Sequence, residues 1–522
     1  MLSNPINALL ERLKGQKFLS EASSGEALIN VNKITEKAGA AYEKIRYLVD
    51  YKDDRHIRRS AIERIIKRKI IFEKGEDIGF SLVQELIAGR YLANNTIPER
   101  ATREVDRIIF KYKLLERHLP VTFREDIRVR NILVSLIGTE IEEFFFPNNE
   151  DDFVAEAFYA TIKDSVKVEG MSRSDMMQTQ ILIACYRSLF NTDDETLRYK
   201  LWQKLTASNW PLLYDEIEIK RVAEASSGVW EYIRHELNDP LSFRLLPKLY
   251  NDAIYFSVVR EVIRAYGAES GRIFEDHEAL THFTEEFLEK NYQSQYAKTR
   301  SSAIRAVLYV FLTKSLLALA VEVPYQVYIL GGLEYFPIAT NIIFHPLLLF
   351  TVTMSTKPLG EENTKAIETG VHNVLSGENI RPIKINLEQT SLFNSLFIIM
   401  YAALFFIVFG IIVFILQRLY FSAASILLFM LFLALISYFA LRIRHSANRW
   451  KVAKEDDRFV TVAFNIFALP IVRAGRWLSR RFSSINVFVF VMDFIIETPF
   501  KMLLHFSDAF VSFLKEKQQD VN

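Results

Sequence analysis

Three residues that can carry charge or exchange a proton lie within otherwise apolar stretches. Lys314 and Glu322 interrupt "VFLTKSLLALAVEVPY" (310–325), and His345 stands in "PIATNIIFHPLLLFTVTM". Ionisable side chains are costly to hold at membrane depth, and where they occur they commonly mark ion or substrate pathways. Lys314, Glu322 and His345 are therefore the candidate functional intramembrane residues of this sequence.

The stretch that contains these residues is compatible with three arrangements. In the first, 303–321 and 336–356 form a hairpin across the membrane, with Lys314 packed in a bundle or reaching toward the headgroups. In the second, the stretch lies flat on the membrane or re-enters it. In the third, Lys314 is the centre of a substrate or ion path. The sequence alone leaves all three open.

A second region is a clearer membrane segment. The runs 389–417 and 419–441 contain no charged residue and are separated only by Arg418. Each run is longer than the roughly 20 residues that a membrane-spanning helix needs. Two such runs joined by a short turn predict a transmembrane helical hairpin over 391–442.

The polar residues of this hairpin are few, and none of them titrates. Proton and ion paths usually need charged groups at depth, so we expect the hairpin to serve as an anchor. Counting outward from the turn places Gly410 level with Ser425. Small residues that face each other let two helices approach closely, so these two residues are the predicted packing contact of the hairpin.

Positive charge is distributed unevenly around the predicted hairpin. Lys and Arg residues gather on both flanks, and Arg418 alone stands at the turn, which places both flanks in the cytoplasm by the positive-inside rule. The loop of the 303–356 segment has two Glu and no Lys or Arg, which agrees with an outside position. The flanking residues are Arg381, Lys384, Arg442, Arg444, Arg449 and Lys451.

The first 300 residues have the composition of a soluble helical region. "RHIRRSAIERIIKRKII" (55–71) repeats apolar residues at steps of three and four, as an amphipathic helix does. Its basic residues form either a solvated face or a contact for anionic lipid or an acidic partner. No nucleic-acid partner is predicted, because the net charge is +1 and no aromatic platform lies nearby. The candidate contact residues are Arg55, Arg58, Arg59, Lys67 and Arg68.

The last 80 residues alternate short apolar stretches with the basic stretch "RAGRWLSRRF". Short amphipathic helices with Arg and Trp at their edges suit the cytoplasmic headgroup layer, where anionic lipid attracts cations. The alternative is packing against the soluble region. The candidate lipid contacts here are Arg473, Arg476, Trp477, Arg480 and Arg481.

Common catalytic and cofactor-binding patterns are missing from the sequence. It contains no phosphate-binding loop of the Gly-Lys-Ser/Thr type and no G-x-S-x-G turn. "HEALTH" (277–282) resembles a zinc signature, but His residues five apart point about 140° away from each other on a helix. We therefore assign no catalytic, cofactor-binding or metal-ligating residue, and we expect Cys185, the single cysteine, in the core.

These patterns together predict an all-α protein. A large helical cytoplasmic N-terminal domain precedes one or two transmembrane hairpins and an amphipathic helical C-terminal tail. The expected regions are two helical cytoplasmic regions (1–120 and 121–300), a membrane or re-entrant hairpin (301–357), a cytoplasmic connector (358–390), the transmembrane hairpin (391–442) and the membrane-proximal tail (443–522).

Several long strings resemble a family of uncharacterised integral membrane proteins from candidate-phylum bacteria. They include "YEKIRYLVDYKDDRHIRRSAIERIIKR", "AIRAVLYVFLTKSLLALAVEVPY" and "NVFVFVMDFIIETPFK", and they extend from near residue 42 to near residue 505. Leu359 stands where relatives are expected to have a second proline, which could loosen the helix that begins near Glu361. The resemblance implies a bacterial inner-membrane location, and it brings no catalytic residues.

The leading functional hypothesis is a non-enzymatic, membrane-anchored helical scaffold or interaction protein of the bacterial cell envelope. Its partners would be the lipid bilayer, anionic lipid at the cytoplasmic face, and other proteins. One alternative is a transporter or channel component that uses 303–356. The other is a lipid-modifying enzyme at the membrane surface.

Overall fold

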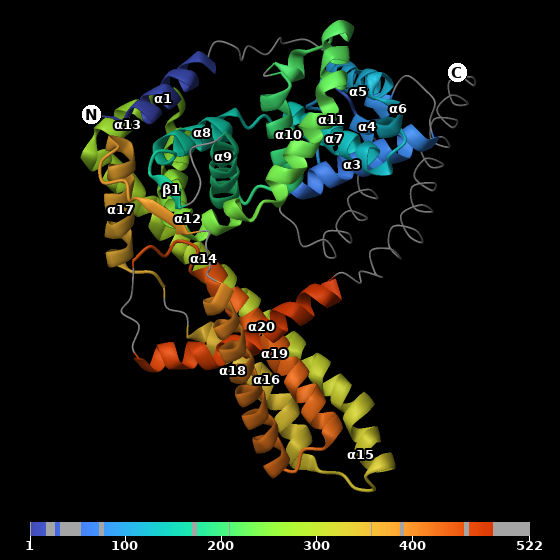
Figure 1. Ribbon diagram of the computed structural model, residues 1–522, viewed down its shortest axis with the longest axis vertical. Coiled ribbons are helices and arrows are strands. Elements are labelled where there is room, and N and C mark those ends of the chain that lie inside the picture. Colours follow the sequence, from blue (N-terminus) through green and yellow to red (C-terminus); the bar gives the residue numbers. More distant parts are fainter. Residues whose placement is uncertain are drawn as a thin grey trace, which may run out of the picture. The chain divides into compact units, whose positions relative to one another are not determined.

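The fold is almost entirely helical, as predicted. The computed structural model describes residues 2–16, 27–31, 54–72, 78–169, 175–207, 209–355, 358–386, 391–453 and 459–483. Of this part of the chain, 83% is helical and 2% is strand, which confirms the all-α class (Figure 1).

The chain divides into two compact units, and neither is continuous in sequence. The front unit is formed by 7–163 and 173–253, and the membrane unit is formed by 1–6, 164–172 and 254–486. Helix α12 (Pro240–Tyr266) belongs partly to each.

The front unit is a stack of short and medium helices around one hydrophobic core. Helix α3 shows how the sequence dictates this packing, because Ala61, Ile62, Ile65 and Ile66 form one stripe and are all buried. The other helices are α1 (Asn4–Gln16), which begins in the membrane unit, α3 (Asp54–Phe72), α4 (Ile78–Ala88), α5 (Arg100–His118), α6 (Val121–Arg124), α7 (Ile127–Phe145), α8 (Asn149–Ile162), α9 (Asp175–Phe190), α10 (Asp194–Leu205), the 3-10 turn η1 (Trp210–Leu212) and α11 (Glu216–Asn238).

A buried polar network crosses the centre of the front unit. Lys111 Nζ donates to Glu140 Oε1 at 2.5 Å and to the carbonyl oxygen of Trp210 at 2.8 Å. The hydroxyl of Tyr112 donates to Glu140 Oε2 at 2.8 Å. Burial lowers the pKa of Lys111 and raises the pKa of Glu140, and their mutual attraction opposes both shifts. The network joins α5, α7 and η1, so it fixes how these elements pack.

The membrane unit contains the long apolar helices. Helix α14 continues through a π-helical turn, η3, into α15 without leaving helical structure. The elements are η2 (Gly267–Glu269), α13 (Ser270–Glu275), α14 (His277–Leu317), η3 (Ala318–Glu322), α15 (Val323–Ile329), α16 (Tyr335–Met354), α17 (Glu361–Ser376), α18 (Ser391–Arg418), α19 (Ala423–Ala447) and α20 (Phe459–Ser483).

A two-stranded parallel sheet, which the sequence did not lead us to expect, belongs to the membrane unit. Strand β1 (Val166–Glu169) pairs with β2 (Ile383–Asn386), with Val166 opposite Ile383. Its apolar residues alternate with polar ones, and Val166, Val168, Ile383 and Ile385 are buried. The sheet therefore joins a segment that precedes α14 in the sequence to a segment that lies between α16 and α18.

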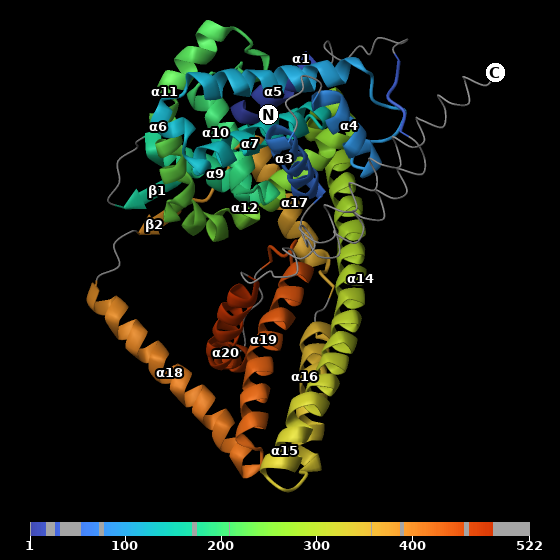
Figure 2. The ribbon, with the colours of Figure 1, turned by 90° about the vertical axis from the view of Figure 1, so that its right-hand side faces the viewer.

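Four helices of the membrane unit are long and apolar enough to cross a membrane: His277–Ile329, Tyr335–Met354, Ser395–Arg418 and Ala423–Ala447. Their large apolar side chains are widely exposed, including Phe406 at 75% and Leu427 at 70%. Exposed apolar surfaces of this extent are typical of contact with a membrane or with another protein. The turn after α15 and the turn between α18 and α19 lie at the same end of this unit (Figure 2).

Candidate functional site

The structure brings Lys314, Glu322 and His345 together in the interior of the membrane helices. Lys314 lies near the end of α14, Glu322 ends the π-helical turn η3, and His345 lies on α16. Each is at most 3% exposed. The residue that joins them is Asn341, which the sequence analysis did not single out. We call these four residues the polar cluster.

Asn341 bridges the two charged residues. Its side-chain oxygen accepts from Lys314 Nζ at 2.5 Å, and its side-chain nitrogen donates to the Glu322 carboxylate. The amide can do this because it offers an acceptor and donors on opposite sides. Asn341 lies four residues before His345, so the two side chains share one face of α16. That spacing was the signal in the sequence that could have identified it.

Helix α19 supplies the remaining contacts of the cluster. Lys314 Nζ lies 4.3 Å from the ring centroid of Phe432, which is a cation–π distance. The Asn341 side-chain nitrogen also approaches the carbonyl oxygen of Ser425 at 3.4 Å. Three helical segments, α14 with η3, α16 and α19, thus converge on the same four side chains.

His345 is held between two backbone carbonyl groups. Nδ1 lies 3.1 Å from the carbonyl oxygen of Asn341, and Nε2 lies 3.0 Å from that of Phe429. A neutral imidazole has one N–H group and can donate to only one of them, whereas the protonated ring donates to both. The ring is fully buried, and it hydrogen-bonds α19 whenever Nε2 carries a proton.

One atom of the cluster lacks a partner among the described residues. Glu322 Oε2 is buried and makes no hydrogen bond, although Oε1 accepts from Asn341. Glu322 belongs to a π-helical turn, and such turns recur at functional sites because they displace a side chain from regular helical spacing.

The predicted close approach at Gly410 is wrong. A Cβ atom added at Gly410 would meet no atom within 4 Å, so α18 is not closely packed there. Ser425 is buried, but its carbonyl oxygen faces Asn341 of α16. The close contact occurs at Gly475 of α20, where an added Cβ would collide with the carbonyl group of Ala434 on α19.

Most of the arginines named on the basic helix α3 form ion pairs within the front unit. The expectation that this helix contacts lipid or an acidic partner is therefore corrected. Arg59 is 6% exposed and pairs with Asp193, so it is not available to lipid. Arg58 and Arg68 pair with glutamates of α7 and α4. Lys67 is exposed, and the side chain of Arg55 lies outside the described residues.

The candidate lipid contacts of the tail lie on the exposed surface of α20. Arg473, Arg476, Arg480 and Arg481 are exposed, and Trp477 is 63% exposed. The Arg473 guanidinium lies 4.6 Å from the ring centroid of Tyr401 on α18. Their contact with lipid stays a prediction. The second apolar stretch of the tail, 485–496, lies outside the described residues.

An apolar cavity of 450 Å³ lies between α16, α18, α19 and α20. Thr340 and Phe344 contribute from α16, Ile412 from α18 and Phe467 from α20. None of the residues that line it is charged, and none belongs to the polar cluster.

Comparison with known proteins finds no relative of this chain. No protein-family model, no curated protein and no solved structure matches the chain.

Proposed function

We propose that the chain is a membrane-anchored interaction protein whose four apolar helices hold the front unit at a membrane. The polar cluster then stabilises the bundle and sets how its helices align. The observation that supports this role is that Lys314 and both ring nitrogens of His345 face partners supplied by the bundle itself. Buried polar residues can specify helix alignment in this way.

The proposed location is the bacterial inner membrane, with both termini in the cytoplasm. Four spans return the chain to the side from which it started. The two turns lie at one end of the membrane unit, as this orientation requires (Figure 2). The unequal distribution of Lys and Arg supports an outside position for these turns.

A short stretch of the front unit supports interaction with another protein. Leu212, Tyr214 and Ile217 lie within six residues of each other and are 80%, 40% and 67% exposed. Adjacent exposed apolar side chains of this size are typical of protein contacts.

A photo-crosslinking amino acid at Leu212 tests this proposal in living cells. We expect an adduct of reproducible mass, and no adduct from the same amino acid at Arg103, which is also exposed on the front unit. Absence of an adduct at Leu212, or equal products at both positions, would contradict the interaction role.

A transporter or channel component is the second candidate, because Glu322 Oε2 has no partner in the described structure. A buried carboxylate with a free oxygen can bind a proton or a cation. Proton and potassium fluxes in proteoliposomes test this function. If the chain has this function, Glu322→Gln should abolish the flux. Glu334→Gln, at the exposed turn, should leave the flux unchanged. A protein without flux, or with flux that neither variant alters, would exclude it.

A further inference from the structure

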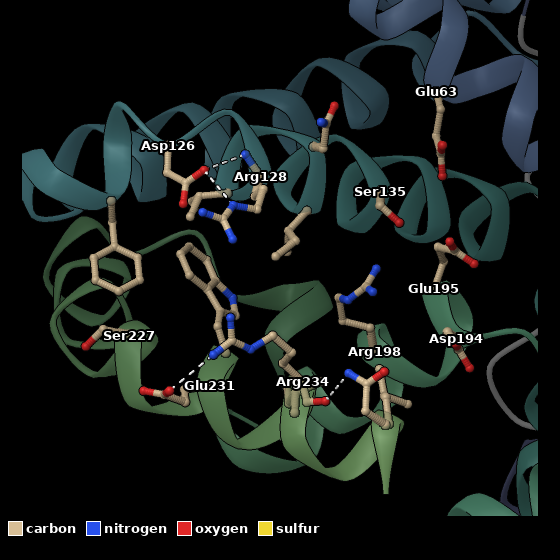
Figure 3. Close-up of a pocket in the computed structure, with 18 of the residues that line it drawn as sticks. Glu63, Asp126, Arg128, Ser135, Asp194, Glu195, Arg198, Ser227, Glu231 and Arg234 are labelled. Atoms are coloured by element: carbon tan, nitrogen blue, oxygen red, sulfur yellow. Dashed lines mark hydrogen bonds and ion pairs between the residues drawn. The ribbon is translucent and has the colours of Figure 1, made fainter. Parts of the chain in front are cut away.

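The front unit contains a cavity that the proposed function does not use. It has a volume of 680 Å³ and lies between α3, α7, α10 and α11, with Phe123 of α6 at one side (Figure 3). This volume is within the range of about 300–1,000 Å³ that is typical of small-molecule sites. We call it the front-unit pocket.

The lining of the front-unit pocket combines an apolar part with charged side chains. Val129 and Ile132 of α7 and Trp230, Ile233 and Leu237 of α11 are apolar lining residues. The ring of Trp230 stacks on Trp202 at 5.7 Å, so the apolar part is backed by the core.

The acidic residues of the pocket are all engaged by arginines. Glu63 and Glu195 pair with Arg59, and Asp194 pairs with Arg187. Two further pairs form within single segments: Asp126 with Arg128, and Glu231 with Arg234. These pairings reduce the negative charge that a ligand would meet.

Arg198 differs from the other arginines of the pocket. It is half-buried on α10, and it makes no hydrogen bond or ion pair with any residue that the structure describes. Figure 3 shows its guanidinium pointing into the pocket toward Ser135 of α7. A guanidinium offers a planar set of donors that matches an oxyanion.

Two buried donors in the lining also lack partners in the described part of the chain. Ser135 and Trp230 are each 6% exposed, and neither Ser135 Oγ nor Trp230 Nε1 makes a hydrogen bond. Buried polar atoms normally have a partner, so two that lack one in the same pocket point to a missing acceptor. In Figure 3 the Ser135 hydroxyl is directed toward Arg198.

We infer that the front-unit pocket binds a small amphipathic anion, a carboxylate or phosphate monoester that carries an apolar group. Arg198, Ser135 and the Trp230 indole N–H bind the oxyanion, and the apolar group lies against the Trp230 ring and its apolar neighbours. The ligand supplies the acceptor atoms that these donors lack, and its apolar group excludes water from the indole surface.

Isothermal titration calorimetry of the full-length protein in neutral detergent tests this site. The probe is benzenesulfonate, which stays a monoanion across the working pH range, with micelles alone as the blank. We expect a dissociation constant of about 1 mM, since the probe is small. Inorganic sulfate lacks the ring and should bind more weakly than benzenesulfonate. Benzyltrimethylammonium has the ring but the opposite charge, so it should not compete with benzenesulfonate.

Matched variants locate the binding. Arg198→Gln should weaken benzenesulfonate binding about tenfold or more, because it removes a charged hydrogen-bond donor. Ser135→Ala removes one donor with little change in shape and should weaken it about threefold. Trp230→Phe removes a donor together with part of the indole surface and should weaken it by about threefold or more. Arg221→Gln removes an exposed charge of α11 that does not line the pocket and should have no effect. Absence of binding, equal effects of Arg198→Gln and Arg221→Gln, or tighter binding of benzyltrimethylammonium would overturn the inference.

Discussion

At the scale of single residues, an uncharged side chain holds the polar cluster together. Asn341 separates Lys314 from Glu322 and bonds to both. Charged residues that interrupt an apolar run are conspicuous in a sequence, so Lys314, Glu322 and His345 could be proposed as candidates. Asn341 was missed because an amide is unremarkable by type and the partners of its side chain lie on other helices, and only its spacing of four residues from His345 pointed to it.

Removing the Asn341 amide should destabilise the membrane unit. We expect Asn341→Leu to cost about 2 kcal/mol or more, because it leaves Lys314 and Glu322 buried without their hydrogen bonds. Thermal unfolding in detergent measures the effect. Thr351→Val, at an exposed position of the same helix, is the control and should change stability by less than about 0.5 kcal/mol. Equal effects of the two variants would argue against a structural role for the cluster.

The two charges of the cluster should depend on each other. Lys314→Met or Glu322→Leu leaves one buried charge without its counterpart, whereas the double variant removes both. We therefore expect the double variant to be more stable than the sum of the single effects predicts, by about 1 kcal/mol or more. A double-mutant cycle measures this coupling. Strictly additive effects would show that the two residues act separately.

Binding in the front-unit pocket should strengthen as the pH falls. Burial raises the pKa of Glu63, and a hydrogen bond with Asp193, followed by burial, raises the pKa of Glu195. Both carboxylates are charged at high pH and repel an anion. They become neutral as the pH falls through their raised pKa values, and this repulsion is then lost. Benzenesulfonate titrations between pH 8 and about pH 5 should show rising affinity, and Glu63→Gln should reduce the dependence. Affinity that falls over this range would contradict the expected sign.

At the scale of secondary-structure elements, the packing of α20 depends on one glycine. Gly475→Ala should destabilise the membrane unit by about 1–3 kcal/mol, because the new methyl group must push α20 away from Ala434. Gly410→Ala has open space around it and should be neutral or stabilise α18 by up to about 1 kcal/mol, because Ala favours a helix more than Gly does. Thermal unfolding of the two variants compares the same chemical change in two settings. A neutral Gly475→Ala would mean that α20 does not pack on α19 as described.

The main helices could largely be predicted from the sequence, whereas the contacts between them could not. Apolar periodicity predicted α3, and uncharged length predicted α18 and α19. The strands were missed because "VKVE" and "IKIN" are too short to show alternation above chance. The charge of α3 was misjudged because its acidic partners, such as Glu142 and Asp193, are remote in sequence.

At the scale of the whole molecule, the number of spans can be tested directly. With Cys185→Ala as background, a single cysteine at Gly332 should react with a membrane-impermeant thiol reagent in intact cells. A cysteine at Gly360 should react only after lysis. Both positions have open space for a side chain. Protection at Gly332 in intact cells would show that the turn after α15 does not reach the outside.

The pairing of β1 with β2 also has a consequence for biosynthesis. The ribosome completes β1 before either apolar helix of the first pair, and it completes β2 only after both. The partner of β1 is therefore absent while the first two spans enter the bilayer. Its edge must stay unpaired during that interval, and closing so long a loop is slow. The sheet can accordingly form only after the first two spans have been synthesised, so the order of the segments in the sequence limits when this part of the membrane unit is completed.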